Sequence, residues 1–176
     1  MDLYKNKYRI GSTRLKDWDY SSNGYYFVTI CTKNRECFFG NIVDGKMILS
    51  EIGKIVLKEW QRTEQIRKNV RLDEWIIMPN HIHGIVVIDN GNVETHCNAS
   101  LQQKYPENNL SFIVRGFKSI STKRIHMSGF HNFAWQSRFY DHIIRDENSL
   151  QKIREYINNN PIKWDVDENN PDFIER

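Results

Sequence analysis

Alternating apolar and polar positions near the start of the chain predict a small sheet followed by a helix. Residues 25–32 are rich in β-branched and aromatic side chains, which favours a strand. Two shorter strands, 37–39 and 46–49, are expected to form a hairpin around an Asp-Gly turn. Ser50 then caps a helix in which apolar residues recur every three or four positions to about residue 64.

The second half of the chain repeats this alternation of strands and helices. Residues 72–78 and 81–88 are apolar runs separated only by Pro-Asn, which requires a tight antiparallel connection. Apolar residues at helical spacing predict a helix over 110–120 and, after Asp146, a helix that ends before Pro161. A further strand is expected between these helices, over 138–144.

The order strand, helix, strand, strand, helix, strand predicts an α+β fold. It is the order of a ferredoxin-like (RRM-like) antiparallel sheet with helices on one face, here with an added hairpin and a C-terminal helix that bears Tyr156. We expect a single domain over 22–164, preceded by a basic arm at 1–21 and followed by an acidic tail at 165–176. Residues 89–108 are Asn-rich and aperiodic, which predicts a surface loop within that domain.

Composition and charge narrow the class of protein. The 176 residues, 39% hydrophobic and 27% charged, suit one globular domain, and no run approaches the roughly 18 apolar residues that a membrane helix needs. With no signal-peptide pattern at the N-terminus, we expect a cytoplasmic protein without a membrane partner. The net charge is +3 although 165–176 holds five carboxylates and one arginine, so the remainder is basic. A basic body is compatible with a phosphate-bearing partner and equally with general solubility.

His81 and His83 are the first residues that could carry chemistry. Side chains alternate across a strand, so two imidazoles at positions 81 and 83 face the same way and can grip one cation. A half-exposed strand face with ordinary hydrogen bonds is the competing interpretation. Residue 85 is Ile, which excludes the HxHxDH motif of metallo-β-lactamase-like hydrolases, and the chain is too short for a (β/α)₈ amidohydrolase.

Tyr156 and Asn160 form a second candidate pair. Residues four apart share a helix face, so this phenol and this amide can approach the same metal and the same phosphate. Alternatively, Tyr156 flanks the apolar stripe of its helix as a core aromatic, and the run of asparagines before Pro161 only ends the helix.

A basic stretch and an aromatic cluster complete the candidates. Residues 111–126 contain no acidic residue, which suits contact with phosphates but also suits a solvated helix face. Three nearby aromatic side chains could stack on bases or belong to the core. The basic candidates are Arg115, Lys118, Lys123 and Arg124, and the aromatic ones are Trp135, Phe139 and Tyr140.

Two separated segments resemble a known family. Residues 75–83, WIIMPNHIH, resemble the His-hydrophobe-His segment of the HUH single-tyrosine transposases, and specifically of the REP-associated tyrosine transposase subgroup. Residues 135–146, WQSRFYDHIIRD, resemble that subgroup's approach to its tyrosine helix. The helix itself matches at Leu150, Ile153, Tyr156, Ile157, Asn160 and Pro161, and Phe117-Lys118-Ser119 resembles the middle helix.

The resemblance implies an enzyme that cleaves and rejoins single-stranded DNA, usually at a hairpin, through a 5′-phosphotyrosine. It implies Tyr156 as nucleophile and His81, His83 and Asn160 as ligands of a divalent metal, Mg²⁺ or Mn²⁺. Tyr140 is the nearest competing nucleophile, but it lies on a predicted strand and lacks a polar residue four positions later. His142 and Arg145 lie in a matched segment, which makes them candidate DNA contacts beside the four basic residues of 111–126.

A non-catalytic module that binds nucleic-acid hairpins on the same fold is the alternative function. Metal dependence and a covalent protein–DNA adduct distinguish the two. Related transposases of the broader superfamily pair as dimers, whereas the REP-associated subgroup need not, so a monomer and a homodimer both stay open for this chain.

Overall fold

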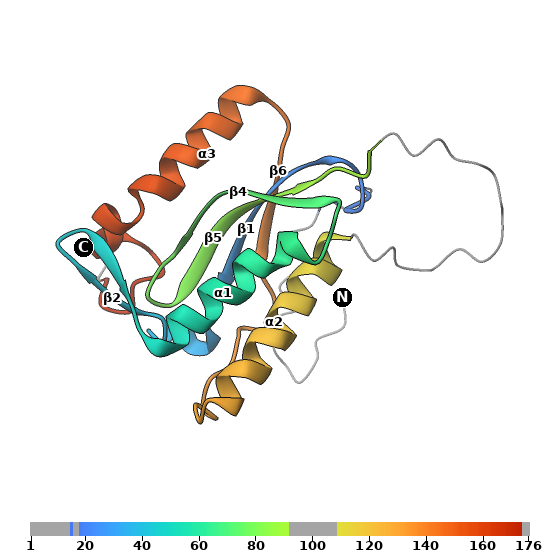
Figure 1. Cartoon of the computed structure of the whole chain (residues 1–176). Coiled ribbons are helices and arrows are strands. Elements are labelled where there is room, and N and C mark those ends of the chain that lie inside the picture. Colours follow the sequence, from blue (N-terminus) through green and yellow to red (C-terminus); the bar gives the residue numbers. More distant parts are fainter. Residues whose placement is uncertain (1–14, 16–17, 92–108, 174–176) are drawn as a thin grey trace, which may run out of the picture.

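The computed structural model describes residues 15, 18–91 and 109–173 of the chain. Within these residues, strands and helices alternate along the sequence as the apolar pattern predicts (Figure 1). They are, in order, β1 (Gly24–Cys31), η1 (Lys33–Arg35), β2 (Gly40–Val43), β3 (Lys46–Leu49), α1 (Glu51–Gln65), β4 (Val70–Ile77), β5 (His81–Ile88), α2 (Leu110–Met127), β6 (Tyr140–Ile144), α3 (Glu147–Asn159) and η2 (Pro161–Val166).

The central sheet has four antiparallel strands in the order β4-β5-β1-β6. Because the first and third core strands, β1 and β5, lie in the middle, the order is that of a ferredoxin-like sheet, and the predicted fold class is confirmed. The added hairpin is a separate two-stranded sheet of β2 and β3, which lies beside η2 (Figure 1).

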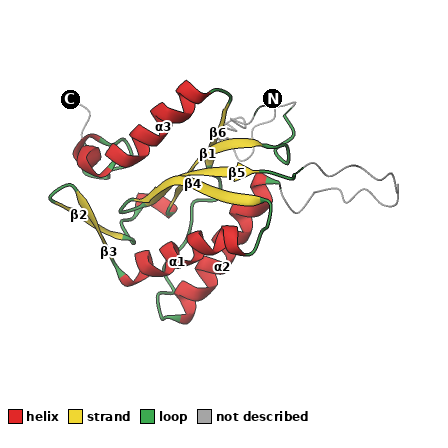
Figure 2. Ribbon diagram, turned by 45° about the horizontal axis from the view of Figure 1, so that its top comes forward, coloured by secondary structure: helices red, strands yellow, loops and turns green. Residues whose placement is uncertain are grey.

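Helices cover both faces of this sheet, with the two crossover helices together on one face. Figure 2 shows α1 and α2 on one side and α3 on the other. On β5, alternate side chains divide accordingly, because Ile82 and Val86 join the α1/α2 core whereas Ile85 and Val87 pack beneath α3. Gly84 lets Trp60 of α1 approach the strand, since a Cβ there would lie 2.7 Å from the indole ring.

The capping residues act as the sequence predicts. Ser50 Oγ accepts a hydrogen bond from the backbone N–H of Gly53 at the start of α1, and Asp146 accepts one from the N–H of Ser149 at the start of α3. Pro161 follows the last turn of α3. The helix expected over 110–120 runs on to Met127, two turns further than predicted.

The strand predicted over 37–39 is wrong. The partner of β3 in the hairpin is Gly40–Val43, and Phe39 lies in the preceding loop. Phe39 donates its backbone N–H to Pro79 O and accepts from the N–H of Ser50, so its hydrogen bonds do not belong to a ladder. Its side chain is fully buried. A buried loop and a strand can both have a short apolar run, so the sequence pattern does not distinguish them.

The domain boundaries stay a prediction. Most of the expected arm (1–14 and 16–17) and most of the expected loop (92–108) lie outside the described residues. The acidic segment is described as far as Phe173, and Asn169 and Asn170 within it are buried. In the part of the chain that the structure describes, none of the helices is long and apolar enough to cross a membrane.

Candidate metal and tyrosine site

Two buried histidines lie at the start of β5, on the face of the sheet that α3 covers. His81 is fully buried and His83 is 2% exposed. Their side chains point the same way, and His81 Nε2 and His83 Nε2 are 3.0 Å apart. The i, i+2 spacing thus produces the predicted pair of imidazoles, whereas the half-exposed strand face of the competing interpretation does not occur.

Asn80 fixes which nitrogen of His81 faces the site. Its amide NH₂ donates to the backbone oxygens of Arg35 (2.8 Å) and Asn169 (2.7 Å), which uses both of its hydrogens. Asn80 Oδ1 must therefore accept from His81 Nδ1, at 2.8 Å. A neutral imidazole that carries its proton on Nδ1 presents the lone pair of Nε2 toward His83. No pattern in the sequence indicates this role for Asn80.

His83 is held between a threonine and the candidate nucleophile. Thr29 Oγ1 lies 2.9 Å from His83 Nδ1, and the Tyr156 hydroxyl lies 3.2 Å from His83 Nε2. A threonine hydroxyl can donate or accept, so it permits either neutral tautomer of His83. A lone pair on His83 Nε2 can accept the Tyr156 proton or bind a cation, but it cannot do both.

Burial keeps both imidazoles neutral, which is the form that binds a metal. It lowers the pKa of His81 to about 3, with the positive charge of Arg35 adding to the effect. Burial and the neighbouring His81 hold the pKa of His83 well below its usual value.

Tyr156 lies in the last turn of α3 and is 45% exposed, so its hydroxyl contacts His83 while the ring remains accessible. Arg154 anchors the helix to the sheet, because its guanidinium donates two hydrogen bonds of 2.8 Å to the Asp73 carboxylate on β4. Burial and the Asp167 carboxylate raise the pKa of Tyr156, and the Asn160 side chain opposes them. The phenol is therefore protonated near neutral pH.

Asp167 brings a carboxylate to the two histidines, and Asn160, one helical turn after Tyr156, has a buried side-chain amide. Asn160 is 3% exposed, and its Oδ1 is buried with no hydrogen-bond partner among the described residues. Asp167 Oδ2 lies 4.0 Å from His81 Nε2, and one ligand atom each of His81, His83 and Asp167 fall within 4.8 Å of one another. An orphaned amide oxygen, a carboxylate and two neutral imidazoles are a donor set that fits a divalent cation.

Asp167 was missed because the sequence assigns it to an acidic tail. The 3-10 helix η2 turns the chain back after α3, and the backbone oxygen of Asn169 then binds Asn80. A carboxylate eleven residues after a candidate nucleophile was the only available signal, and four other carboxylates in the same segment obscured it.

The basic residues of α2 do not flank Tyr156, since α2 covers the opposite face of the sheet (Figure 2). Lys118 Nζ donates to the backbone oxygens of Gln136 (2.7 Å) and Arg138 (3.0 Å), and burial lowers its pKa to about 8. Arg124 forms an ion pair with the buried carboxylate of Glu59. Both side chains hold the fold together, while Arg115 and Lys123 are exposed on the helix.

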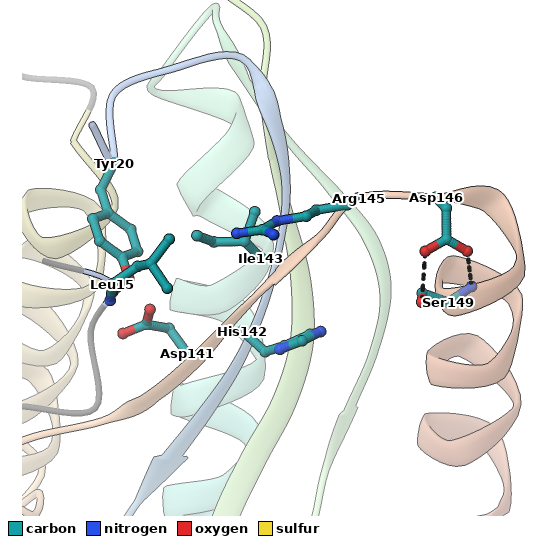
Figure 3. Close-up of a pocket in the computed structure, with 8 residues that line it drawn as sticks. All are labelled: Leu15, Tyr20, Asp141, His142, Ile143, Arg145, Asp146 and Ser149. Atoms are coloured by element: carbon teal, nitrogen blue, oxygen red, sulfur yellow. Dashed lines mark hydrogen bonds between the residues drawn. The ribbon is translucent and has the colours of Figure 1, made fainter. Parts of the chain in front are cut away.

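His142 and Arg145 lie at the opposite end of α3 from Tyr156. They line a pocket with Leu15, Tyr20 and Asp146, beside the N-terminus of the helix (Figure 3). Asp146 starts α3 and Tyr156 is ten residues on, so about 15 Å of helix separates this pocket from the tyrosine. Neither side chain joins the metal and tyrosine site.

The chain is similar to one protein in sequence and to a solved structure in fold. No family model matches the sequence. An uncharacterized protein of Haemophilus influenzae is 43% identical over 164 residues, which cover 89% of this chain and 91% of that protein. The solved structure of a REP-associated tyrosine transposase bound to a REP hairpin matches with a TM-score of 0.60 and 21% identity, covering 86% of this chain and 74% of that chain. The likeness shows that the two share a fold.

Proposed function

This chain belongs to one family with the Haemophilus influenzae protein and has the fold of an HUH tyrosine transposase, and from that premise we propose that it cleaves and rejoins single-stranded DNA through Tyr156. The observation that carries the proposal is the position of the Tyr156 hydroxyl, which lies 3.2 Å from His83 Nε2, the nitrogen that with His81 Nε2 would hold a cation. A tyrosine that only filled the core would not need its hydroxyl beside two buried imidazoles while its ring is half exposed.

We propose that His81 Nε2, His83 Nε2 and oxygens of Asp167 and Asn160 hold one divalent cation. A bound cation would offset the charge of a phosphodiester and polarise its phosphorus. Mg²⁺ and Mn²⁺ both suit the two oxygens, and the imidazoles favour Mn²⁺ of the two. Asp167 extends the ligand set beyond the three residues that the sequence suggests.

The residues of the chain then divide the work of the reaction. The Asp73–Arg154 ion pair keeps α3 in place, so Tyr156 can meet a phosphate without reorganisation. The phenolic oxygen forms a bond to phosphorus, the bond from phosphorus to the 3′-oxygen breaks, and the phenol loses the proton that the leaving 3′-hydroxyl gains. The product is a 5′-phosphotyrosine, and attack by a second 3′-hydroxyl reverses the step without an external energy source.

The REP hairpin held by a transposase of the same fold supports one substrate class. We propose a single-stranded DNA hairpin as the partner of this chain, with the exposed Arg115 and Lys123 and the pocket at His142 and Arg145 as sites of phosphate contact. Because these groups lie away from Tyr156, they would bind DNA beyond the cleavage point.

A denaturing gel tests the nucleophile. Single-stranded hairpins from the DNA flanking the gene, labelled at the 3′ end, are incubated with protein and Mg²⁺ or Mn²⁺, because the 3′ fragment stays attached to the tyrosine. Wild type and the control Tyr140→Phe are expected to give a labelled protein band that requires metal. Tyr156→Phe is expected to give none. Tight hairpin binding by wild type with no adduct and no cleavage would instead support a non-catalytic binding module.

Calorimetric titration with Mn²⁺ tests the ligands separately from the reaction. Asp167→Asn and Asn160→Ala are expected to weaken Mn²⁺ binding by at least about 10-fold, since the first removes the negative charge of a carboxylate ligand and the second removes an oxygen donor. Glu168→Gln is the matched control, because Glu168 is an exposed carboxylate next to Asp167 outside the ligand cluster. Equal affinities in Asp167→Asn and Glu168→Gln would remove Asp167 from the ligand set.

A further inference from the structure

A pocket of about 410 Å³ opens beside Tyr156, toward the edge of the sheet that β6 forms. Its lining combines aromatic rings with amide and guanidinium groups. The aromatic members are Phe27, Phe139, Tyr140 and Tyr156, and the polar ones include Gln136, Arg138 and Asn169. A pocket of this volume falls in the range that holds small ligands.

The strand register puts Tyr140 on the same face of the sheet as His83, which contacts the candidate nucleophile Tyr156. Thr29 of β1 is directly opposite His83 of β5 on one side and Tyr140 of β6 on the other. Residues directly opposite one another in antiparallel strands point to the same face. With strands about 4.8 Å apart, Tyr140 lies about 10 Å from His83, measured between backbones.

Tyr140 differs in exposure from the other aromatic residues of its segment. Trp135 and Phe139 pack against the core, whereas Tyr140 is 50% exposed. Its ring meets the edge of Phe27 at 6.3 Å between centroids, and Phe27 in turn stacks on His83 at 5.4 Å. A row of contacting rings therefore connects the exposed Tyr140, through the buried Phe27, with His83.

The polar edge of this pocket is held by the backbone. The N–H of Gln136 donates to Cys31 O at 2.9 Å, and Lys118 Nζ binds the backbone oxygens of Gln136 and Arg138. With the backbone fixed in this way, the side chains of Gln136 and Arg138 line the pocket wall. Glu168 also lines it, so one carboxylate offsets the one guanidinium of Arg138 and the lining has no excess of positive charge to favour a phosphate over an uncharged base.

Resting on the proposed function, we propose that Tyr140 is a stacking platform for one nucleobase of the DNA strand that Tyr156 attacks. A flat aromatic ring stacks on any base, and amide and guanidinium groups at its edge can hydrogen-bond the base edge. At about 3.4 Å per nucleotide, a separation of about 10 Å corresponds to about three nucleotides, so we expect this base within about three nucleotides of the scissile phosphate. Gln136 and Arg138 would then bias which base is accepted.

Fluorescence of 2-aminopurine tests the stacking directly. Hairpin strands from the DNA flanking the gene carry 2-aminopurine at one single-stranded position at a time, and the full chain carries Tyr156→Phe so that no strand is cut. Binding is expected to quench the fluorophore at one or two adjacent positions. Tyr140→Ala, combined with Tyr156→Phe, is expected to abolish that quenching and raise Kd about 5-fold to 150-fold, the range for loss of one stacked base.

Two controls separate stacking from loss of fold. Tyr140→Phe keeps the ring and is expected to retain the quenching, with Kd within about 3-fold of the parent. Met127→Ala removes another exposed large hydrophobic side chain, on α2 and outside the pocket, and is expected to leave both the quenching and Kd unchanged. Thermal unfolding of each variant checks that the fold is intact.

The outcomes distinguish this inference from the proposed function. If wild type forms the tyrosine adduct but Tyr140→Ala keeps its Kd and its quenching pattern, the stacking platform is refuted and the transesterase is not. If wild type binds none of these hairpins, the substrate class and the stacking platform are both refuted.

Discussion

Replacing Asn80 by alanine removes the group that orients His81. In the wild type this buried amide donates to Arg35 O and Asn169 O and accepts from His81 Nδ1. After truncation, nothing fixes the Nδ1 proton, so His81 Nε2 no longer presents its lone pair in a defined direction. The C-terminal segment that carries Asp167 also loses a tie to the sheet.

The size of the effect follows from the three hydrogen bonds. At about 0.5–1.5 kcal/mol each, their loss lowers the free energy of unfolding by about 1.5–4.5 kcal/mol. A middle value of about 3 kcal/mol lowers Tm by about 6–12 °C in a chain of this length. Loss of a group that orients a metal ligand weakens metal binding by about 10-fold to 100-fold.

Thermal unfolding followed by circular dichroism and calorimetric titration with Mn²⁺ measure the two effects separately. Asn159→Ala is the matched control, since Asn159 is exposed at the end of α3 and is expected to change stability by less than about 0.5 kcal/mol. A variant Asn80→Ala that lost stability yet bound Mn²⁺ within about 2-fold of wild type would refute the orienting role. Unchanged stability would refute the hydrogen-bond network itself.

Two further predictions concern the ion pairs that hold the helices on the sheet. Arg124→Ala leaves the carboxylate of Glu59, which is 1% exposed, without its nearest cation. Urea titration is therefore expected to show a free energy of unfolding lower by about 2–3 kcal/mol. The control Lys123→Ala, at a neighbouring exposed residue, should lower it by less than about 0.5 kcal/mol. The hydrogen bonds from Arg154 lower the pKa of Asp73 below its ordinary value of 3.8, so this pair stabilises the fold above about pH 4 and ceases to do so as the pH falls through the lowered pKa. Unfolding curves from pH 2 to pH 6 should therefore show wild type more stable than Asp73→Asn above pH 4 and equal to it at the acidic end, and a difference independent of pH would contradict the assignment.

The different roles of the basic residues on α2 show where charge alone misleads. Four cations on one helix predict a phosphate-binding face, and two of them, Lys118 and Arg124, instead bind carbonyl oxygens and a buried carboxylate. Their partners, in the segment before β6 and on α1, lie far along the chain. A cation with a partner inside its own protein cannot be told from a free one by sequence spacing.

Local sequence patterns were sufficient to predict most of the elements and to single out residues that could carry chemistry. Periods of two and of about 3.6 residues separate strands from helices, and their order is sufficient for a ferredoxin-like sheet. His81 and His83 face the same way because alternate side chains of any strand do so, and Tyr156 precedes Asn160 by one helical turn wherever α3 packs. These are local properties, which need no knowledge of the rest of the fold. The hairpin strand at Gly40–Val43 was misplaced because a buried loop and a strand are equally apolar.

Contacts between residues far apart along the chain could not be predicted in this way. Asp167 reaches the histidines because η2 turns the chain back after α3, and Asn80 binds Asn169 across 89 residues of sequence. Register and packing leave the ring of Tyr140 exposed, whereas the ring of Trp135 is partly buried against the core. Such contacts depend on how several elements pack together, and the sequence pattern of one element does not show which other elements will contact it.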